Sequence, residues 1–266
     1  MKDIAVLVKA SLNPEIVRQG SDGRFDIDYT PLKISDIDRN ALEEAARLKG
    51  LLGGKVYAIS VLSWGPVRAR DKDVKLAVQE ALAKAADEAY LIEEEEILPT
   101  DQAIVASAIA ALMKSKGLRP AIVLAGEASV DESTSQVPAR VAAKLGYSFV
   151  GHVNKIIEVK GDKVVVERDV EEYTEILEVP LPLVISVTQS INEPKPPTLI
   201  QIRMASKKPL HVLSAKDIGF TSRPARSIEE MKVVTTSRKQ LIIEEANVEK
   251  AVEKLLELLH KEGVLR

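Results

Sequence analysis

Cysteine is absent from this sequence of 266 residues. The absence excludes disulfide bridges, thiolate metal sites, iron–sulfur clusters and cysteine nucleophiles. Histidine is scarce as well, and the spacing of His152, His211 and His260 fits neither a zinc site nor a serine–histidine–aspartate triad. We therefore expect no metal site in this chain.

Long apolar runs are also missing, because no stretch approaches the ~18 residues that a membrane span needs. The apolar run at residues 4–8 is too short for a signal peptide. Lysine plus arginine (37) nearly balances aspartate plus glutamate (40), and the net charge of −3 indicates no nucleic-acid partner. We expect a cytoplasmic protein that does not insert into membranes.

Aromatic residues are few, at 3% of the chain. Asparagine and glutamine are sparse too, whereas glutamate and lysine are abundant. This balance is typical of thermophilic proteins. A helix-rich composition has the same bias, so both explanations stay open.

Short apolar runs alternate with amphipathic segments as far as Gly146. The apolar runs predict buried parallel strands at residues 4–8, 55–62, 88–92 and 121–125. The amphipathic segments predict helices at residues 35–48, 73–86, 102–116 and 134–144. The alternation predicts a doubly wound, mostly parallel α/β sheet. Between the first strand and helix we expect a loop at 11–14 and a short strand at 23–29.

The pattern changes after Gly146. Segments 153–159 and 163–168 are joined by a hairpin signal, and two further strand-like stretches lie within 175–187. We expect all of these to form an antiparallel extension of the sheet. The proline-rich stretch 190–197 predicts extended backbone, and a helix is expected at 198–206.

The C-terminal part has a different character. Residues 218–240 show little periodicity, and an amphipathic helix is expected at 247–258. A long aperiodic segment before a terminal amphipathic helix favours a segment that wraps a partner, although the helix could also fold back on its own core. We divide the chain into an α/β domain (1–215) and a C-terminal arm (216–266).

Ligands of open α/β sheets bind at the carboxyl ends of the strands. The richest such end is the stretch 126–136, which holds Gly126, four hydroxyl side chains and the start of the next predicted helix. Backbone N–H groups and hydroxyls at a helix start suit a phosphate. The alternative is that Ser133 or Thr134 merely caps the helix. No glycine-rich dinucleotide fingerprint and no Walker A motif occurs.

Two other features have both a chemical and a structural interpretation. Asp36 and Asp38 could act as paired carboxylates in acid–base chemistry, or they could pair with the dipole of the following helix. Trp64 could stack on a ring or pack in the core.

Several motifs, in order and with fitting spacing, resemble the β subunit of electron transfer flavoprotein over essentially the whole chain. They are VLVK (6–9), ALEEAARLK (41–49), ALAKAADEA (81–89), GEASVDESTSQV (126–137), VER (166–168), VPLP (179–182), NEP (192–194) and KKP (207–209). The resemblance implies an adenine-nucleotide α-hydrolase-like fold. It also implies a heterodimer with an α subunit, which carries the electron-transferring FAD in a mobile domain.

In that family the β subunit holds either AMP, which is structural, or a second FAD, which accepts hydride from NADH and bifurcates its electrons. Thr134 with Gln136 and Val137 resembles the version that holds FAD. The resemblance makes segment 190–208 the loop that docks partner dehydrogenases or quinone oxidoreductases, with Leu199 as its apolar anchor. By the same resemblance Asp169 contacts the mobile FAD domain, and the arm packs on the α subunit.

Carried over by position, the resemblance also implies the nucleotide contacts. They are Leu7, Lys9, Ser35, Asp36, Ile37, Asp38, Trp64, Gly126, Ser129, Val130, Asp131, Ser133, Thr134, Ser135, Gln136 and Val137. Thr134, followed by Gln136, is the best candidate for the phosphate. Two alternatives stay open: a stand-alone adenine-nucleotide-binding module resembling stress proteins, and an enzyme that uses Asp36 with Asp38, or Asp131, in acid–base chemistry.

Overall fold

The molecule is described here from a computed structural model that covers residues 1–27, 29–62, 64–65, 67–94, 101–221, 225, 228–233 and 239–265. Contacts between residues divide the chain into two units, Met1–Lys232 and Val233–Arg266. The predicted division at residue 215 stays a prediction.

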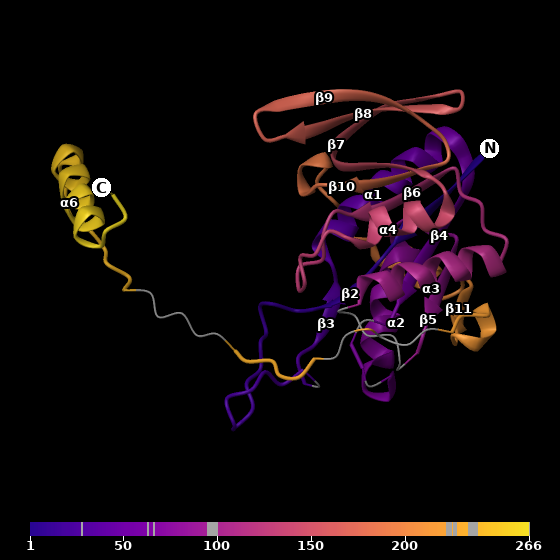
Figure 1. Cartoon of the computed structure of the whole chain (residues 1–266), viewed down its shortest axis with the longest axis horizontal. Coiled ribbons are helices and arrows are strands. Elements are labelled where there is room, and N and C mark those ends of the chain that lie inside the picture. Colours follow the sequence, from indigo (N-terminus) through magenta and orange to yellow (C-terminus); the bar gives the residue numbers. More distant parts are fainter. Residues whose placement is uncertain are drawn as a thin grey trace. The chain divides into compact units, whose positions relative to one another are not determined.

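A nine-stranded sheet forms the centre of the first unit, in the order β11-β5-β4-β1-β6-β10-β7-β8-β9 (Figure 1). Neighbours from β11 to β7 are parallel, whereas β8 pairs antiparallel with both β7 and β9. The strands are β1 (Lys2–Leu7), β4 (Gly53–Val61), β5 (Glu88–Ile92), β6 (Ile122–Gly126), β7 (Ser148–Lys160), β8 (Lys163–Val170), β9 (Tyr173–Pro180), β10 (Leu183–Val187) and β11 (Leu210–Leu213).

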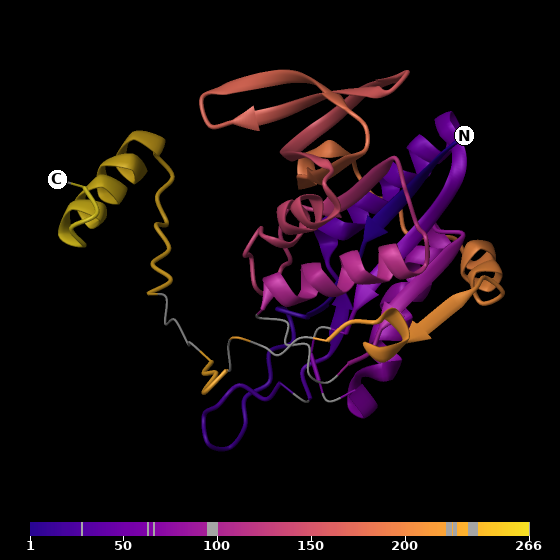
Figure 2. The same ribbon diagram turned by 45° about the vertical axis from the view of Figure 1, so that its right-hand side comes forward.

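Helices cover both faces of this sheet. Alternate side chains of β1 show the two layers: Ile4 and Val6 pack with α1 (Asp36–Leu52) and α2 (Val67–Lys84). Ala5 and Leu7 pack on the other face with α3 (Gln102–Ser115) and α4 (Val137–Leu145), which lie together over the sheet in Figure 2. The predicted doubly wound α/β fold is confirmed.

The remaining elements are short. They are β2 (Ala10–Leu12), β3 (Leu32–Ile34), α5 (Leu199–Ala205), and the 3-10 turns η1 (Gln189–Ile191) and η2 (Lys216–Ile218). Strand β2 overlaps the loop predicted at 11–14 and pairs antiparallel with β3, for which nothing was predicted. The described part of 23–29 forms isolated bridges at Arg24 and Phe25 rather than the predicted strand. Asp101 caps α3, because its carboxylate accepts a hydrogen bond from Ile104 N at 3.2 Å.

The antiparallel extension is smaller than predicted. Only β8 and β9 belong to it, because β10 lies between β6 and β7 and runs parallel to both. All five residues of β10 are buried. Continuous burial is typical of a central parallel strand. The apolar run at 183–187 did not by itself say whether this strand lies in the antiparallel extension or in the centre of the sheet, and the order of the strands decided for the centre. Strand β11 was not predicted at all.

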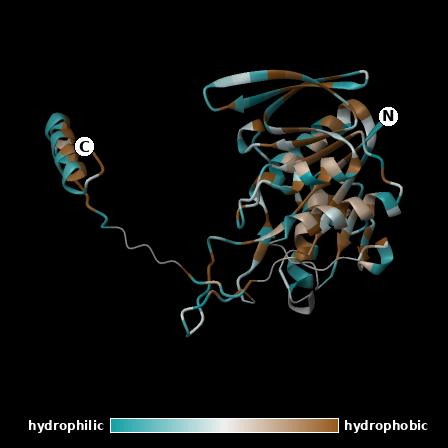
Figure 3. Ribbon diagram, viewed as in Figure 1, coloured by the Kyte–Doolittle hydropathy of each residue, from teal (hydrophilic) through white to brown (hydrophobic). Residues whose placement is uncertain are grey.

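The second unit contains α6 (Val248–Lys261), which begins where the sequence predicted a helix. Asn247 caps it by accepting from Lys250 N at 2.9 Å. Apolar and polar residues lie on different sides of α6 (Figure 3), and Val252, Leu255 and Leu256 are all exposed. Among the described residues, no helix combines the length and the apolarity that crossing a membrane requires.

Candidate functional site

A cavity lies at the carboxyl ends of β1, β4 and β6, with about 730 Å³ of space that is partly open to solvent. The helix after β1 leads to β4 over one face of the sheet, whereas α3 leads to β6 over the other. The adjacent carboxyl ends of β1 and β6, which pair in parallel, are therefore the topological switch point, where open α/β sheets bind ligands.

One side of the cavity is apolar. Ile59 and Val61 of β4 reach it from the sheet, and Val105 and Ile109 of α3 reach it from the layer above. None of these residues was predicted. Their signal in the sequence was the alternation along β4 and the apolar face of α3, which both indicate burial but do not say that a cavity lies beside them. Such walls suit a flat heterocyclic ring.

Asp38 is a buried acidic residue that lines the cavity. Its carboxylate accepts hydrogen bonds from Lys9 N at 2.7 Å and from Gly126 N at 3.1 Å. Burial raises the pKa of Asp38 to about 7, although the hydrogen bonds from Lys9 and Gly126 act in the opposite direction. Asp38 therefore ties the first turn of α1 to the ends of β1 and β6.

Gly126 allows this close approach. A Cβ atom at this position would lie 2.7 Å from Asp38 Oδ1 and 3.0 Å from Ile37 Cγ2. We expect Gly126→Ala to push the first turn of α1 away from β6 and to lower the free energy of unfolding by about 1–3 kcal/mol. Urea unfolding of the purified protein measures the change.

Gly50→Ala is the matched control, because a Cβ at Gly50 of α1 meets nothing within 4 Å. It is expected to raise stability by about 0.5–1 kcal/mol, since alanine favours helix more than glycine does. A Gly126→Ala variant as stable as the unmodified protein would contradict the tight contact.

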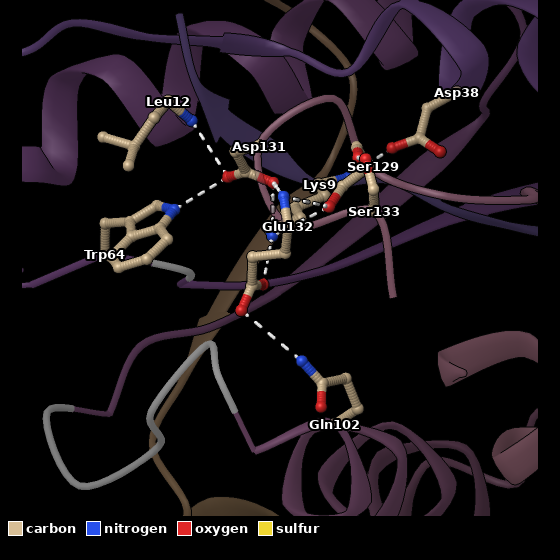
Figure 4. Close-up of polar contacts among 9 residues, drawn as sticks. All are labelled: Lys9, Leu12, Asp38, Trp64, Gln102, Ser129, Asp131, Glu132 and Ser133. Atoms are coloured by element: carbon tan, nitrogen blue, oxygen red, sulfur yellow. Dashed lines mark hydrogen bonds and ion pairs between the residues drawn. The ribbon is translucent and has the colours of Figure 1, made fainter. Parts of the chain in front are cut away.

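Lys9 is the centre of a charged network at the mouth of the cavity (Figure 4). Its Nζ lies 2.8 Å from Asp131 Oδ1, 2.5 Å from Glu132 Oε2 and 3.1 Å from Ser129 Oγ. Two carboxylates thus face one ammonium. The charge of Lys9 is therefore balanced within its own chain.

Asp131 links this network to other elements. Its carboxylate also accepts from Trp64 Nε1 at 2.8 Å and from Leu12 N at 3.1 Å. Burial alone would raise the pKa of Asp131, but the charge of Lys9 and the side-chain hydrogen bonds from Lys9, Ser129 and Trp64 outweigh it and lower the pKa below the ordinary value. For Glu132, burial prevails over Lys9 and raises the pKa. Asp131 is therefore a structural carboxylate that stays ionised.

The loop from Asp131 to α4 has an unusual backbone. Ser133 and Ser135 have φ values of 49° and 53°, in the left-handed region. The alternation of left-handed and ordinary residues makes α4 begin at Val137, three residues later than predicted. Within the described residues, no acceptor of the protein bonds the N–H groups of Thr134, Ser135, Gln136 and Val137. N–H groups at a helix start, on such a backbone, form a concave anion site.

Nine of the predicted contacts line the cavity. They are Leu7, Lys9, Asp38, Gly126, Ser129, Thr134, Ser135, Gln136 and Val137. Whether they contact a nucleotide stays a prediction. Of the other predicted residues, Val130 and Ser133 lie in the same loop, and the Ser133 hydroxyl donates to Ser129 O at 3.2 Å.

Other predicted contacts lie behind the cavity wall. Ser35 is fully buried and donates its N–H to Lys9 O, while Ile37 packs against Gly126. Trp64 is buried and holds Asp131 rather than lining the cavity. Asp36 pairs at the surface with Arg39 at 2.6 Å. Asp36 and Asp38 thus have different partners, so the structure gives no acid–base pair of these two carboxylates.

The two predicted docking residues lie elsewhere on the first unit. Leu199 begins α5 and is 85% exposed. Asp169 is an exposed residue of β8 and accepts from Thr174 Oγ1 at 3.2 Å. Neither is near enough to the cavity to line it.

A comparison with known families agrees with this geometry. The family model described as "Electron transfer flavoprotein domain" matches residues 24–218, well over half of the chain. The match spans α1, the loop at 126–137 and α5. The chain belongs to the electron transfer flavoprotein family, whose members carry electrons with the help of a flavin.

Proposed function

We propose that this chain is the β subunit of a heterodimeric electron transfer flavoprotein and that its cavity holds FAD or AMP. The observation that carries the proposal is the pairing of apolar walls with a row of N–H groups across one cavity. The walls from β4 and α3 suit an adenine ring. The N–H groups of residues 134–137 suit the adjoining phosphate.

This assignment gives Lys9 an indirect role. Because Asp131 and Glu132 neutralise Lys9, the phosphate relies on backbone N–H groups and on the positive end of the α4 dipole. Lys9 and Asp131 instead hold the loop that presents those groups. When bound, an FAD would supply hydride acceptance from NADH and one-electron transfer, whereas AMP would supply neither.

The nucleotide content of the purified complex tests the proposal. The chain is co-expressed with an α subunit, the bound nucleotides are released by heat, and chromatography identifies them. Two FAD per heterodimer would support the bifurcating type, which Thr134 and Gln136-Val137 favour; one FAD with one AMP would support a structural nucleotide in this chain. A homodimer that binds ATP or AMP without an α subunit, or a chain with no nucleotide, would overturn the proposal.

Partner recognition is assigned to a docking segment, residues 190–208. Its helix α5 exposes Leu199, Ile200 and Met204 at 85%, 72% and 60%. An exposed apolar helix of this kind fits a hydrophobic pocket on an acyl-CoA dehydrogenase-like or quinone oxidoreductase partner. Asp169 is proposed to contact the mobile FAD domain of the α subunit, and the apolar side of α6 to pack on that subunit.

Leu199→Ala is expected to raise the KM for a purified acyl-CoA dehydrogenase about tenfold, because the largest exposed apolar anchor is lost. Nucleotide content should not change, since Leu199 does not line the cavity. Steady-state electron transfer with varied dehydrogenase concentration measures the effect. Leu51→Ala is the control, because Leu51 is a 66% exposed leucine outside the docking segment. Equal kinetics for both variants would remove Leu199 from the anchor role.

A further inference from the structure

We infer that Asn40 and Lys208 are positioning residues that clamp the docking segment in its binding conformation before any partner arrives. The inference rests on the docking function proposed above and adds the residues that make it work. Asn40 holds the beginning of the segment on α1, and Lys208 holds its end on α2. Neither residue is one of the two predicted contact residues, Leu199 and Asp169, although Lys208 is the last residue of the docking segment.

Asn40 is 4% exposed, which is unusual for an asparagine in the interior of a helix. Its Nδ2 donates to Gln189 O at 3.1 Å and to Asn192 O at 2.7 Å. In return, Asn192 Nδ2 donates to Asn40 O at 3.0 Å. The two side-chain amides form a reciprocal pair. Together they donate hydrogen bonds to backbone carbonyl groups of α1 and of the turn where β10 leads into the docking segment.

A second contact lies one turn further along α1. Glu43 accepts from Lys195 N at 2.9 Å, and Lys84 Nζ donates to Lys195 O at 2.7 Å. Glu43 and Lys84 are themselves an ion pair. Both backbone groups of Lys195 are therefore held, one by α1 and one by α2.

Lys208 closes the other end. Its Nζ donates to Leu82 O at 2.6 Å and to Ala86 O at 2.7 Å, at the carboxyl end of α2. A lysine there satisfies terminal carbonyl groups and matches the negative end of the helix dipole. Burial, together with the nearby charge of Lys49, lowers the pKa of Lys208, which agrees with an ammonium placed among carbonyl groups rather than in water.

The part between the clamps is ordered but exposes its apolar side chains. Thr198 and Gln201 form a capping box at the start of α5, and Ala205 is buried against the core. Leu199 and Ile200 remain exposed. A recognition element held in its bound shape loses less conformational entropy on binding, so the clamp lowers the partner concentration that is needed.

Hydrogen–deuterium exchange of the heterodimer, read by mass spectrometry, tests the clamp. We expect Asn40→Ala and Lys208→Ala each to speed exchange in residues 189–207 at least tenfold, with exchange at residues 126–137 unchanged. Asn192→Ala should have the same effect as Asn40→Ala, and the double variant should add nothing, because the two amides act as one pair. Asn192→Ala also serves as a second test of this pair if Asn40→Ala fails to fold. Lys207→Ala is the matched control, since this neighbouring lysine is exposed.

Kinetics supply the second measurement. With a purified acyl-CoA dehydrogenase as probe, Asn40→Ala and Lys208→Ala should raise KM at least fivefold and leave kcat and nucleotide content unchanged. Exchange at wild-type rates in both variants would overturn the clamp. The proposed docking function fails separately, if Leu199→Ala leaves KM unchanged; in that case faster exchange would still establish the clamp.

Discussion

Replacing Asp131 with alanine is expected to lower the free energy of unfolding by about 3–5 kcal/mol, the range for breaking a buried ion pair from one side. The Asp131 side chain is 4% exposed. Its loss leaves Trp64 Nε1 and Leu12 N without their acceptor and gives Lys9 only Glu132 as a carboxylate partner. Urea unfolding of the purified protein measures the change.

The same variant should lose most of its nucleotide. Asp131 ties the loop at 126–137 to β2 and to Trp64, and that loop carries the N–H groups proposed to bind the phosphate. Without this tie the site is no longer preorganised. The nucleotide released by heat from Asp131→Ala, set against that from the unmodified protein, gives the loss directly.

Glu132→Gln is the matched control for Asp131→Ala. Glu132 also pairs with Lys9, but its other contact is a longer one of 3.4 Å from Gln102. We expect less than half of the loss in stability. A loss as large as that of Asp131→Ala would show that the charge on Lys9, and not the three-way link of Asp131, holds the loop.

The stability of the protein should also fall as the pH rises from about 4 to 7, because of Asp38. Its pKa in the folded protein is about 7, against an ordinary value of 3.8, so the folded state holds this proton more tightly than the unfolded chain. Between those pH values Asp38 is ionised in the unfolded chain and protonated in the folded protein, so folding takes up a proton. A shift of about three pKa units corresponds to roughly 4 kcal/mol, present in full below pH 4 and lost above pH 7.

Asp38→Asn should remove this part of the pH dependence, because an amide does not titrate. The difference in slope between the two proteins is expected to approach about 1.4 kcal/mol per pH unit near pH 5.5. Asp87→Asn is the control: hydrogen bonds from Lys49 and Val56 overcome the effect of burial and lower the pKa of Asp87, so its titration lies below this window. Parallel stability curves for Asp38→Asn and the unmodified protein would show that Asp38 is ionised throughout.

The local pattern of the sequence was enough for four central strands of the sheet and for the position of the cavity. The apolar runs at 4–8, 55–62, 88–92 and 121–125 became β1, β4, β5 and β6, because a buried parallel strand needs a continuous apolar run. The hydroxyl-rich stretch after Gly126 lies at the switch point, since alternating strands and helices must bring the carboxyl ends of strands to one edge.

The tertiary structure decided which residues meet there. Lys9 contacts Asp131 and Glu132, more than 120 residues away, and Asn40 contacts Asn192 across a similar separation. Periodicity indicates that a residue is buried, but it does not say which strands are neighbours. The order of strands in the sheet sets those pairs, and it placed β10 between β6 and β7 and brought Ile59 and Val105 to the cavity. The sequence alone determined the layers and the edge of the sheet at which the cavity lies. Only the folded chain determined that Lys9 pairs with two carboxylates, and that the N–H groups of residues 134–137 have no acceptor among the described residues.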